Sequence, residues 1–163
     1  MGNASKPRKI RLSTTPTPEA LAELRLGDVV YLDGLIYTAR EGVYKRALED
    51  KANIPMELPG ESAANFHCSP AAAINEDGTF RLGAVTATAS FRFSKWIGEW
   101  MAKSGAKLII GKGGMSAKDY KDHFVPNGAI YLTTVGYGTG ALLGRGVKRV
   151  KTVHWNKELG LAQ

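Results

Sequence analysis

The chain has 163 residues, 44% hydrophobic and 23% charged, which is typical of one globular domain with its own core. Its net charge of +7 directs attention to anionic partners, whereas its single cysteine, Cys68, excludes an internal disulfide and any Cys-based metal or iron-sulfur site built from this chain alone. No apolar run approaches the ~20 residues of a membrane span, and the N-terminus lacks a signal-peptide core, so we expect a cytoplasmic location and no membrane partner.

The positive charge is concentrated near the two ends of the sequence. Residues 1–12 contain four basic residues and no acid, and we predict that they form a disordered basic leader before a single domain over residues 13–163. A second basic cluster lies close to the C-terminus. The basic residues of the two clusters are Lys6, Arg8, Lys9 and Arg11, and Lys148, Arg149 and Lys151.

The first half of the domain is predicted to be mostly β. Thr17 is a helix N-cap candidate with Pro18 in the first turn, and the helix it begins should end by Gly27. Residues 28–38 are two β-rich runs separated by Asp33-Gly34, a pattern that predicts a hairpin. Residues 41–51 then favour a helix.

The middle of the chain carries weaker signals, and the second half alternates strands with helices. Residues 53–83 are rich in turn-forming residues, with strand residues expected at Phe66 and Phe80 and a turn at Asp77-Gly78. The apolar face of residues 93–101 predicts a helix from Ser94 to Lys103, ended by Gly105. The remaining predictions are strands over 82–88, 107–110, 129–135 and 147–155, a helix over 116–124, and a helix after the glycines of 136–140. Parallel crossovers should therefore join the strands of an α/β fold.

Two glycine-rich stretches resemble nucleotide-binding loops but fail on spacing. Around Lys112, "LIIGKGGMS" would need a glycine at 106 and a hydroxyl at 113 to be a phosphate-binding P-loop, and it has Ala106 and Gly113. The glycines at 136, 138 and 140 follow a strand, but the third arrives one residue early for a dinucleotide fingerprint. We interpret both stretches as something other than phosphate loops.

The other common catalytic patterns are also weak. The three histidines, at 67, 123 and 154, have no metal-ligand spacing. No G-x-S-x-G elbow is present, so a Ser-His-Asp hydrolase is not indicated.

Cations and hydroxyls stand where predicted strands end. Arg40 follows "LIYTA", Lys112 follows "LII", and the hydroxyl-rich run that ends at Arg92 follows "LGAV". That run carries Thr86, Thr88 and Ser90. Any one of these could be an ordinary surface residue, but three cations in equivalent positions together suit a small dianion. Glycines beside Lys112, at 111, 113 and 114, would let a ligand or a second chain approach the backbone closely.

Four stretches in order carry a resemblance to a known family. "GDVVYLDGLIYTAREGVYKRALE", "TATASFRF", "KLIIGKGGMS" and "VHWNKELG" resemble the β subunit or C-terminal domain of iron-sulfur hydro-lyases, the class I fumarases and L(+)-tartrate dehydratases, over about residues 13–161. The resemblance implies a swivelling, three-layer β/β/α domain that docks on an α subunit. It also implies a 4Fe-4S cluster held by cysteines of that α subunit, a heterodimer or heterotetramer, and a chain that is catalytically incomplete alone.

The resemblance also assigns roles to residues of this sequence. Arg40, Arg92 and Lys112 would bind the carboxylates of a small hydroxy-dicarboxylate of the malate or tartrate type, and Thr88 would be the catalytic base. The supporting residues would be Lys45, Arg46, Gly111, Gly113 and Gly114. The reaction would remove a proton alpha to a carboxylate and lose water from the neighbouring carbon, or the reverse.

Departures from the family pattern leave alternatives open. Glu41 and Tyr44 replace the Asp and His of R-D-x-x-H-K-R, and residues 68–70 read Cys-Ser-Pro in place of Ala-Gly-Pro. The usual "GPTT" turn appears as residues 83–88, and the family generally continues through another strand beyond Gln163. A non-catalytic module that binds a dicarboxylate or acts as a scaffold therefore stands beside the enzyme hypothesis. Nucleic-acid binding by the basic clusters is a disfavoured third, whose signature would be steep salt dependence.

Overall fold

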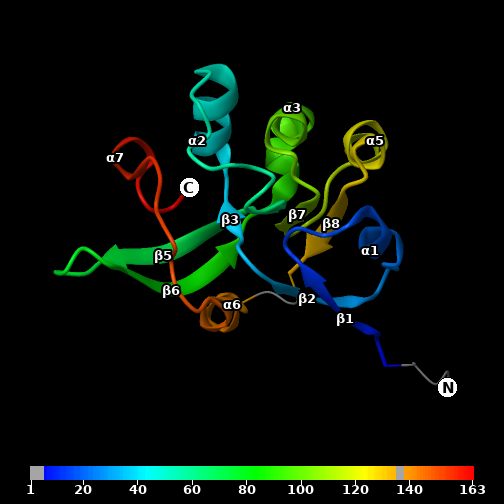
Figure 1. Cartoon of the computed structure of the whole chain (residues 1–163), viewed down its shortest axis with the longest axis horizontal. Coiled ribbons are helices and arrows are strands. Elements are labelled where there is room, and N and C mark those ends of the chain that lie inside the picture. Colours follow the sequence, from blue (N-terminus) through cyan, green and yellow to red (C-terminus); the bar gives the residue numbers. More distant parts are fainter. Residues whose placement is uncertain (1–5, 135–137) are drawn as a thin grey trace.

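Four parallel strands form the central sheet of the protein (Figure 1). The computed structural model describes residues 6–134 and 138–163. The strands lie in the order β3-β4-β7-β8 and comprise β3 (Tyr37–Thr38), β4 (Ala64–Phe66), β7 (Leu108–Gly111) and β8 (Ile130–Thr133). Because all four run in the same direction, their carboxyl ends meet at one edge of the sheet.

Helical segments cover one face of this sheet, where α2, α3 and α5 lie along the top of the view in Figure 1. They are α2 (Glu41–Tyr44) with the π-helical turn η1 (Lys45–Glu49), the 3-10 turn η2 (Ser90–Phe93) with α3 (Ser94–Ser104), and the run α4 (Ala117–Asp119), η3 (Tyr120–Phe124) and α5 (Val125–Asn127). Their apolar side chains pack on Ile109 around Tyr44, Trp96 and Trp100, all of them buried. The three predicted helices are thereby confirmed to within a few residues.

Capping residues explain where these helices begin and end. The Ser116 hydroxyl accepts a hydrogen bond from the Asp119 N–H, and the Asp119 carboxylate accepts one from the Ser116 N–H, which makes a capping box. Gly105 follows α3 with φ +67°, a left-handed conformation that glycine adopts readily, and it ends the helix as expected.

A smaller layer covers the opposite face of the central sheet. It consists of β1 (Lys9–Ser13), paired in parallel with β2 (Val29–Asp33), and α1 (Pro18–Ala22), whose first turn is capped by Thr17. Leu12 and Leu21 of this layer pack on Leu108 and Ile110. Since apolar layers cover both faces of β7, the uninterrupted run Leu108–Ile110 is wholly buried, as expected for a central parallel strand.

An antiparallel hairpin extends from the carboxyl edge of the sheet. It pairs β5 (Cys68–Ile74) with β6 (Phe80–Ala87) around the predicted turn at Asp77-Gly78. The helix α6 (Gly140–Gly146) packs on β6 so closely that a Cβ atom on Gly144 would lie 2.0 Å from the Gly83 carbonyl oxygen. The short helix α7 (Asn156–Leu159) follows on the other side of the hairpin (Figure 1).

The predicted hairpin over residues 28–38 is wrong. Its two halves belong to different sheets, because β2 pairs with β1 and β3 pairs with β4, each in parallel. The Thr14 N–H donates to the Asp33 carbonyl 3.2 Å away, and a Cβ atom on Gly34 would lie 2.2 Å from the Thr14 hydroxyl oxygen. Thr14 therefore occupies the turn, and Gly34 with φ +135° carries the chain out of the smaller sheet instead of folding it back.

The disordered leader is wrong for residues 9–12. These residues form most of β1, and Leu12 is buried against the central sheet. Arg8 and Arg11 form ion pairs with Asp28 and Asp33, each at 2.6 Å, so their charges are engaged by β2 and the residue before it. Residues 1–5 lie outside the described part of the chain.

The strand predicted over residues 147–155 is also wrong, because residues 147–154 have no regular structure. Val147, Val150 and Val153 recur every third residue, so a strand would place them on alternate faces.

The α/β class and the parallel crossovers are confirmed, whereas the specific swivelling β/β/α domain stays a prediction. The predicted strand over 129–135 and the predicted glycine turn at 136–140 both include residues that lie outside the described part of the chain, namely 135–137. No helix in the described ranges is long and apolar enough to cross a membrane.

Candidate functional site

The segments that carry Thr88 and Lys112 are joined by backbone hydrogen bonds at the carboxyl edge of the sheet. The Thr88 N–H donates to the His67 carbonyl at 2.6 Å, and the Lys112 N–H donates to the Thr88 carbonyl at 3.2 Å. The Ser90 N–H donates in turn to the Lys112 carbonyl at 3.1 Å. The end of β6 is thus inserted between the ends of β4 and β7, which brings the predicted base and one predicted cation to the same place.

Arg40 lies at this edge of the sheet as well. The Ala39 N–H donates to the Phe66 carbonyl at 3.4 Å, and the His67 N–H donates to the Ile110 carbonyl at 2.8 Å. These bonds extend the pairing of β3 with β4 and of β4 with β7 beyond the regular strands. Arg40 is the second residue after β3 and is the N-cap residue of α2.

The glycine turn after β7 depends on having no side chains. A Cβ atom on Gly111 would lie 2.0 Å from the Ser90 hydroxyl oxygen and 3.2 Å from the Thr88 carbonyl. Gly113 and Gly114 have φ values of +77° and +72°, which other L-residues adopt only with strain. At Gly111 the close approach is one between parts of this chain, and it fixes the path of the backbone beside Thr88, whereas a Cβ atom on Gly113 would meet nothing within 4 Å.

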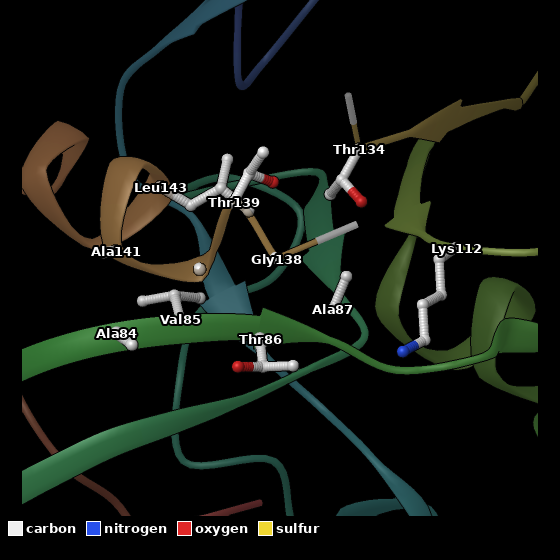
Figure 2. Close-up of a pocket in the computed structure, with 11 residues that line it drawn as sticks. Ala84, Val85, Thr86, Ala87, Lys112, Thr134, Gly138, Thr139, Ala141 and Leu143 are labelled. Carbon is white, nitrogen blue, oxygen red and sulfur yellow. The ribbon is translucent and has the colours of Figure 1, made fainter. Parts of the chain in front are cut away.

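A pocket of about 220 Å³ opens beside Lys112. Figure 2 shows the lysine side chain extending from the end of β7 towards β6, with the Thr134 hydroxyl turned towards the same space. Thr86 contributes a second hydroxyl, and Val85 and Leu143 contribute apolar surface. A cation with nearby hydroxyls and an apolar wall suits a small carboxylate. Arg40, Thr88 and Arg92 are not among the residues that line this pocket.

Arg40 has a different set of neighbours. Its Nη1 donates to the Ala162 carbonyl at 2.8 Å, and its Nε is buried with no hydrogen-bond partner within residues 6–134 and 138–163. The thiol of Cys68 lies in its electrostatic reach: burial raises the pKa of that thiol to about 12, and the Arg40 charge opposes the increase. One donor of the guanidinium is therefore occupied by the C-terminal residues, which return to α2 (Figure 1).

Arg92 is exposed in η2 and contributes to the field at Glu41. Lys45 pairs with the Glu41 carboxylate at 2.6 Å and lowers the pKa of that group most, with smaller contributions from Arg92 and Lys95. Arg92 therefore lies within electrostatic reach of Glu41, which is the first residue of α2 and directly follows Arg40.

The other residues expected to support the site have partners of their own. Arg46 pairs with Glu158 at 3.0 Å and lies over the Trp155 ring, 5.2 Å from its centre. By contrast, Lys112 and Arg92 form no ion pair in the part of the chain that the structure describes.

A buried set of polar side chains lies behind this edge. Hydrogen bonds join Asn65, Tyr44, His67, Ser90 and Tyr131 in that order. From the sequence, His67 is a candidate only for metal binding, and Ser90 is one of several hydroxyls in the run that ends at Arg92. The one signal in the sequence was a histidine directly after a buried strand, a position that usually needs hydrogen-bond partners.

The donor atoms of this chain do not fit an iron-sulfur cluster. Cys68 is its single cysteine, it is completely buried, and its raised pKa keeps it a neutral thiol, whereas clusters are held by several thiolates. Within the described ranges, no three His, Cys, Asp or Glu side chains are placed to bind a metal ion.

Comparison with known proteins agrees with the resemblance. The "L(+)-tartrate dehydratase subunit beta" of Escherichia coli K12 is 33% identical over 156 residues, which cover 94% of this chain and 74% of that protein. The "Putative fumarate hydratase class I" of Geobacillus stearothermophilus is 35% identical over 135 residues, covering 81% of this chain but only 25% of that protein. The "Putative L(+)-tartrate dehydratase subunit beta" of Methanocaldococcus jannaschii is 32% identical over 148 residues. A family model described as "Fumarase C-terminus" matches residues 1–163, and the chain therefore belongs to this family.

Proposed function

We propose that the chain is the β subunit of a hydro-lyase that reversibly hydrates and dehydrates a small hydroxy-dicarboxylate of the fumarate/malate or tartrate type. The observation that carries the proposal is the pairing of the Thr88 and Lys112 segments beside Arg40 at one edge of the sheet, in a chain of the fumarase C-terminal family. Two relatives that it matches over most of their length are named as β subunits of tartrate dehydratases.

The cations would hold the substrate's carboxylates. Lys112 extends to a pocket of about 220 Å³, which has room for a small dicarboxylate, and it has no competing acid within the described residues. The planar guanidinium groups of Arg40 and Arg92 suit a carboxylate in two-point contact. Together they would fix the substrate and stabilise the charge that develops on a carboxylate when the neighbouring carbon loses a proton.

Thr88 would move that proton. Thr88 is partly exposed, and its hydroxyl makes no hydrogen bond in the part of the chain that the structure describes. A threonine hydroxyl is a poor base in water, so this role requires nearby cations that stabilise the alkoxide. Lys112, held next to Thr88 by the backbone bond, is the best placed of the three.

The remaining chemistry would come from a partner. Because the donors of this chain do not fit a cluster, we place the 4Fe-4S cluster on an α subunit, where it would act on the hydroxyl group that leaves or is added. The β chain alone would then be inactive, and the assembly would be a heterodimer or heterotetramer.

One observation favours the second candidate, a non-catalytic dicarboxylate-binding module. Arg40 already donates to the Ala162 carbonyl, and the Glu41 carboxylate already lies in the field of Lys45 and Arg92. In this candidate the cations would bind an anion without any turnover.

A Thr88→Ala variant separates the two candidates. The full chain is assembled with its cluster-bearing α subunit under anaerobic conditions, and turnover of malate, fumarate, tartrate and mesaconate is measured. An enzyme should lose nearly all turnover on Thr88→Ala while it still binds the dicarboxylate, and Thr152→Ala, at an exposed position that does not line the pocket, should behave as wild type. An assembled complex with intact cluster that turns over none of the four compounds contradicts the proposed function.

A further inference from the structure

A continuous chain of buried hydrogen bonds runs behind the candidate site. The Tyr44 hydroxyl lies 2.7 Å from Asn65 Oδ1 and 2.6 Å from His67 Nε2. On the other side of the imidazole, the Ser90 hydroxyl lies 2.8 Å from His67 Nδ1 and 2.9 Å from the Tyr131 hydroxyl. Tyr44, Asn65, His67 and Ser90 are completely buried, so these groups depend on one another for hydrogen bonds.

The bonding capacity of each group fixes the direction of this chain, starting from its Asn65 end. The Ala39 carbonyl can only accept, so the Asn65 amide donates to it, at 3.5 Å, and turns its oxygen to Tyr44. Tyr44 must then donate its one proton to Asn65, and its oxygen is left to accept from His67 Nε2. His67 is therefore the neutral tautomer with the proton on Nε2.

The rest of the chain follows from that tautomer. His67 Nδ1 carries no proton, so the Ser90 hydroxyl donates to it and accepts from the Tyr131 hydroxyl. From the Tyr131 hydroxyl to the Ala39 carbonyl, the hydrogen bonds thus all run in the same direction along the chain.

Both ends of the chain, and its middle, lie next to the residues of the candidate site. Ala39 immediately precedes Arg40, Ser90 lies between Thr88 and Arg92, and the Tyr131 hydroxyl lies against Gly111, the residue before Lys112, where a Cβ atom would be 3.0 Å from it. A neutral imidazole in a single tautomer both donates and accepts, which an apolar side chain cannot do.

We propose that His67 is a positioning residue, which holds the segments carrying Arg40, Thr88 and Lys112 in fixed register through this chain of hydrogen bonds. The proposal rests on the proposed function, because it takes these residues as the catalytic and binding groups. His67 is completely buried, so it acts through Tyr44 and Ser90 and does not touch the substrate. Glutamine can replace His67 in part, because its side-chain amide also has a donor group, NH2, and an acceptor oxygen.

The first experiment uses the full chain alone. Nitrogen chemical shifts of the His67 ring near neutral pH should show a proton on Nε2 and none on Nδ1, and the opposite tautomer or a mixture overturns the proposal. His67→Phe should shift the amide signals of both Arg40 and Gly111, whereas His67→Gln should shift them less. Signals at both positions that stay as in the wild type also overturn it.

A matched pair of tyrosines tests the link to the glycine turn. The Tyr120 hydroxyl accepts from the Met115 N–H at 2.9 Å but makes no bond to Ser90, whereas the Tyr131 hydroxyl lies 2.9 Å from the Ser90 hydroxyl. Tyr131→Phe should therefore change the His67 ring signals, whereas Tyr120→Phe should leave them unchanged. Equal effects of the two variants count against the chain. This pair also serves if His67→Phe does not fold.

The second experiment uses the assembled complex with the α subunit. Displacement of a catalytic group by about 1 Å can cost on the order of 100-fold in rate, so His67→Phe should lower kcat at least about 10-fold. His67→Gln should restore kcat to within about 3-fold of wild type, a rescue not expected if the residue only fills space. If the wild-type complex shows no turnover, the proposed function is contradicted, but the tautomer of His67 measured on the chain alone is not affected. Full activity of His67→Phe in an active complex defeats the positioning role alone.

Discussion

As the pH falls, the protonation of His67 in the unfolded chain should destabilise the protein at a higher pH than the protonation of the carboxylates does. The imidazole is completely buried, and burial lowers its pKa to about 3 because the charged form is excluded from water. Its closest ring neighbours are Phe93 and Tyr44, with ring centres 4.7 Å and 5.9 Å away, and no charged group contributes to the shift.

The sign and size follow from the difference between the folded and unfolded pKa values. An unfolded histidine titrates near pH ~6.5, so below that pH the unfolded chain binds a proton that the folded chain does not bind until about pH 3. The free energy of unfolding should be independent of this group at higher pH and fall by about 1.4 kcal/mol for each pH unit once the pH is well below 6.5. At about pH 5 the loss should be about 2 kcal/mol.

The window between about pH 7 and pH 5 isolates this histidine. Asp28, Glu41 and Glu61 have lowered pKa values because of hydrogen bonds to Arg8, Lys45 and Lys151 respectively. Their stabilisation is complete above the unfolded pKa of a carboxyl group, about 4, and is lost only as the pH falls below that value.

Denaturant unfolding at the two pH values measures the effect. The wild-type chain should lose about 2 kcal/mol between about pH 7 and pH 5, and His67→Gln should lose much less, whatever its stability at neutral pH. A wild-type stability that does not change over this range, or the same loss in His67→Gln, refutes the reasoning.

Three further predictions concern the hairpin, the thiol and the pocket. Gly144→Ala should lower the free energy of unfolding by about 1–3 kcal/mol in thermal or denaturant melts, because its Cβ meets a backbone carbonyl at 2.0 Å, whereas Gly146→Ala in the same helix meets nothing and should be neutral or slightly stabilising. Equal stability of the two would contradict the packing described. Cys68 should resist thiol-specific reagents in the native chain at neutral pH and react only on unfolding, since it is buried and its pKa is raised to about 12; rapid native labelling would be the opposite result. Lys112→Gln should raise the KM for the dicarboxylate at least about 10-fold in the assembled complex, and Lys148→Gln should leave it unchanged; similar KM values for the two would argue against a carboxylate site at Lys112.

Local sequence was sufficient wherever the signal lay within a few residues. The Thr17 cap, the apolar face of α3 with Gly105 after it, the apolar run of β7 and the Asp77-Gly78 turn were all predicted correctly. Each depends on backbone preferences or on burial of one face, which neighbouring residues specify.

Strand partners were not predictable in this way. The Asp33-Gly34 pair indicated a hairpin, but β2 found its partner in β1, about 20 residues earlier, which had been assigned to a disordered leader. A strand's own residues determine that it pairs, whereas the competing edges of the folded sheets determine with which strand.

In the candidate site, too, some features follow from local sequence and others only from the tertiary structure. Sequence alone placed Arg40, Thr88 and Lys112 after strands, and parallel strands bring Arg40 and Lys112 to one edge, whereas Thr88 reaches that edge through the antiparallel hairpin of β5 and β6. Sequence did not reveal that Tyr44 bonds to His67 23 residues away, or that Ser90 bonds to Tyr131 41 residues away. Only the tertiary structure decided these contacts, because a buried polar group accepts whichever partner the packing of the surrounding elements places within hydrogen-bond distance.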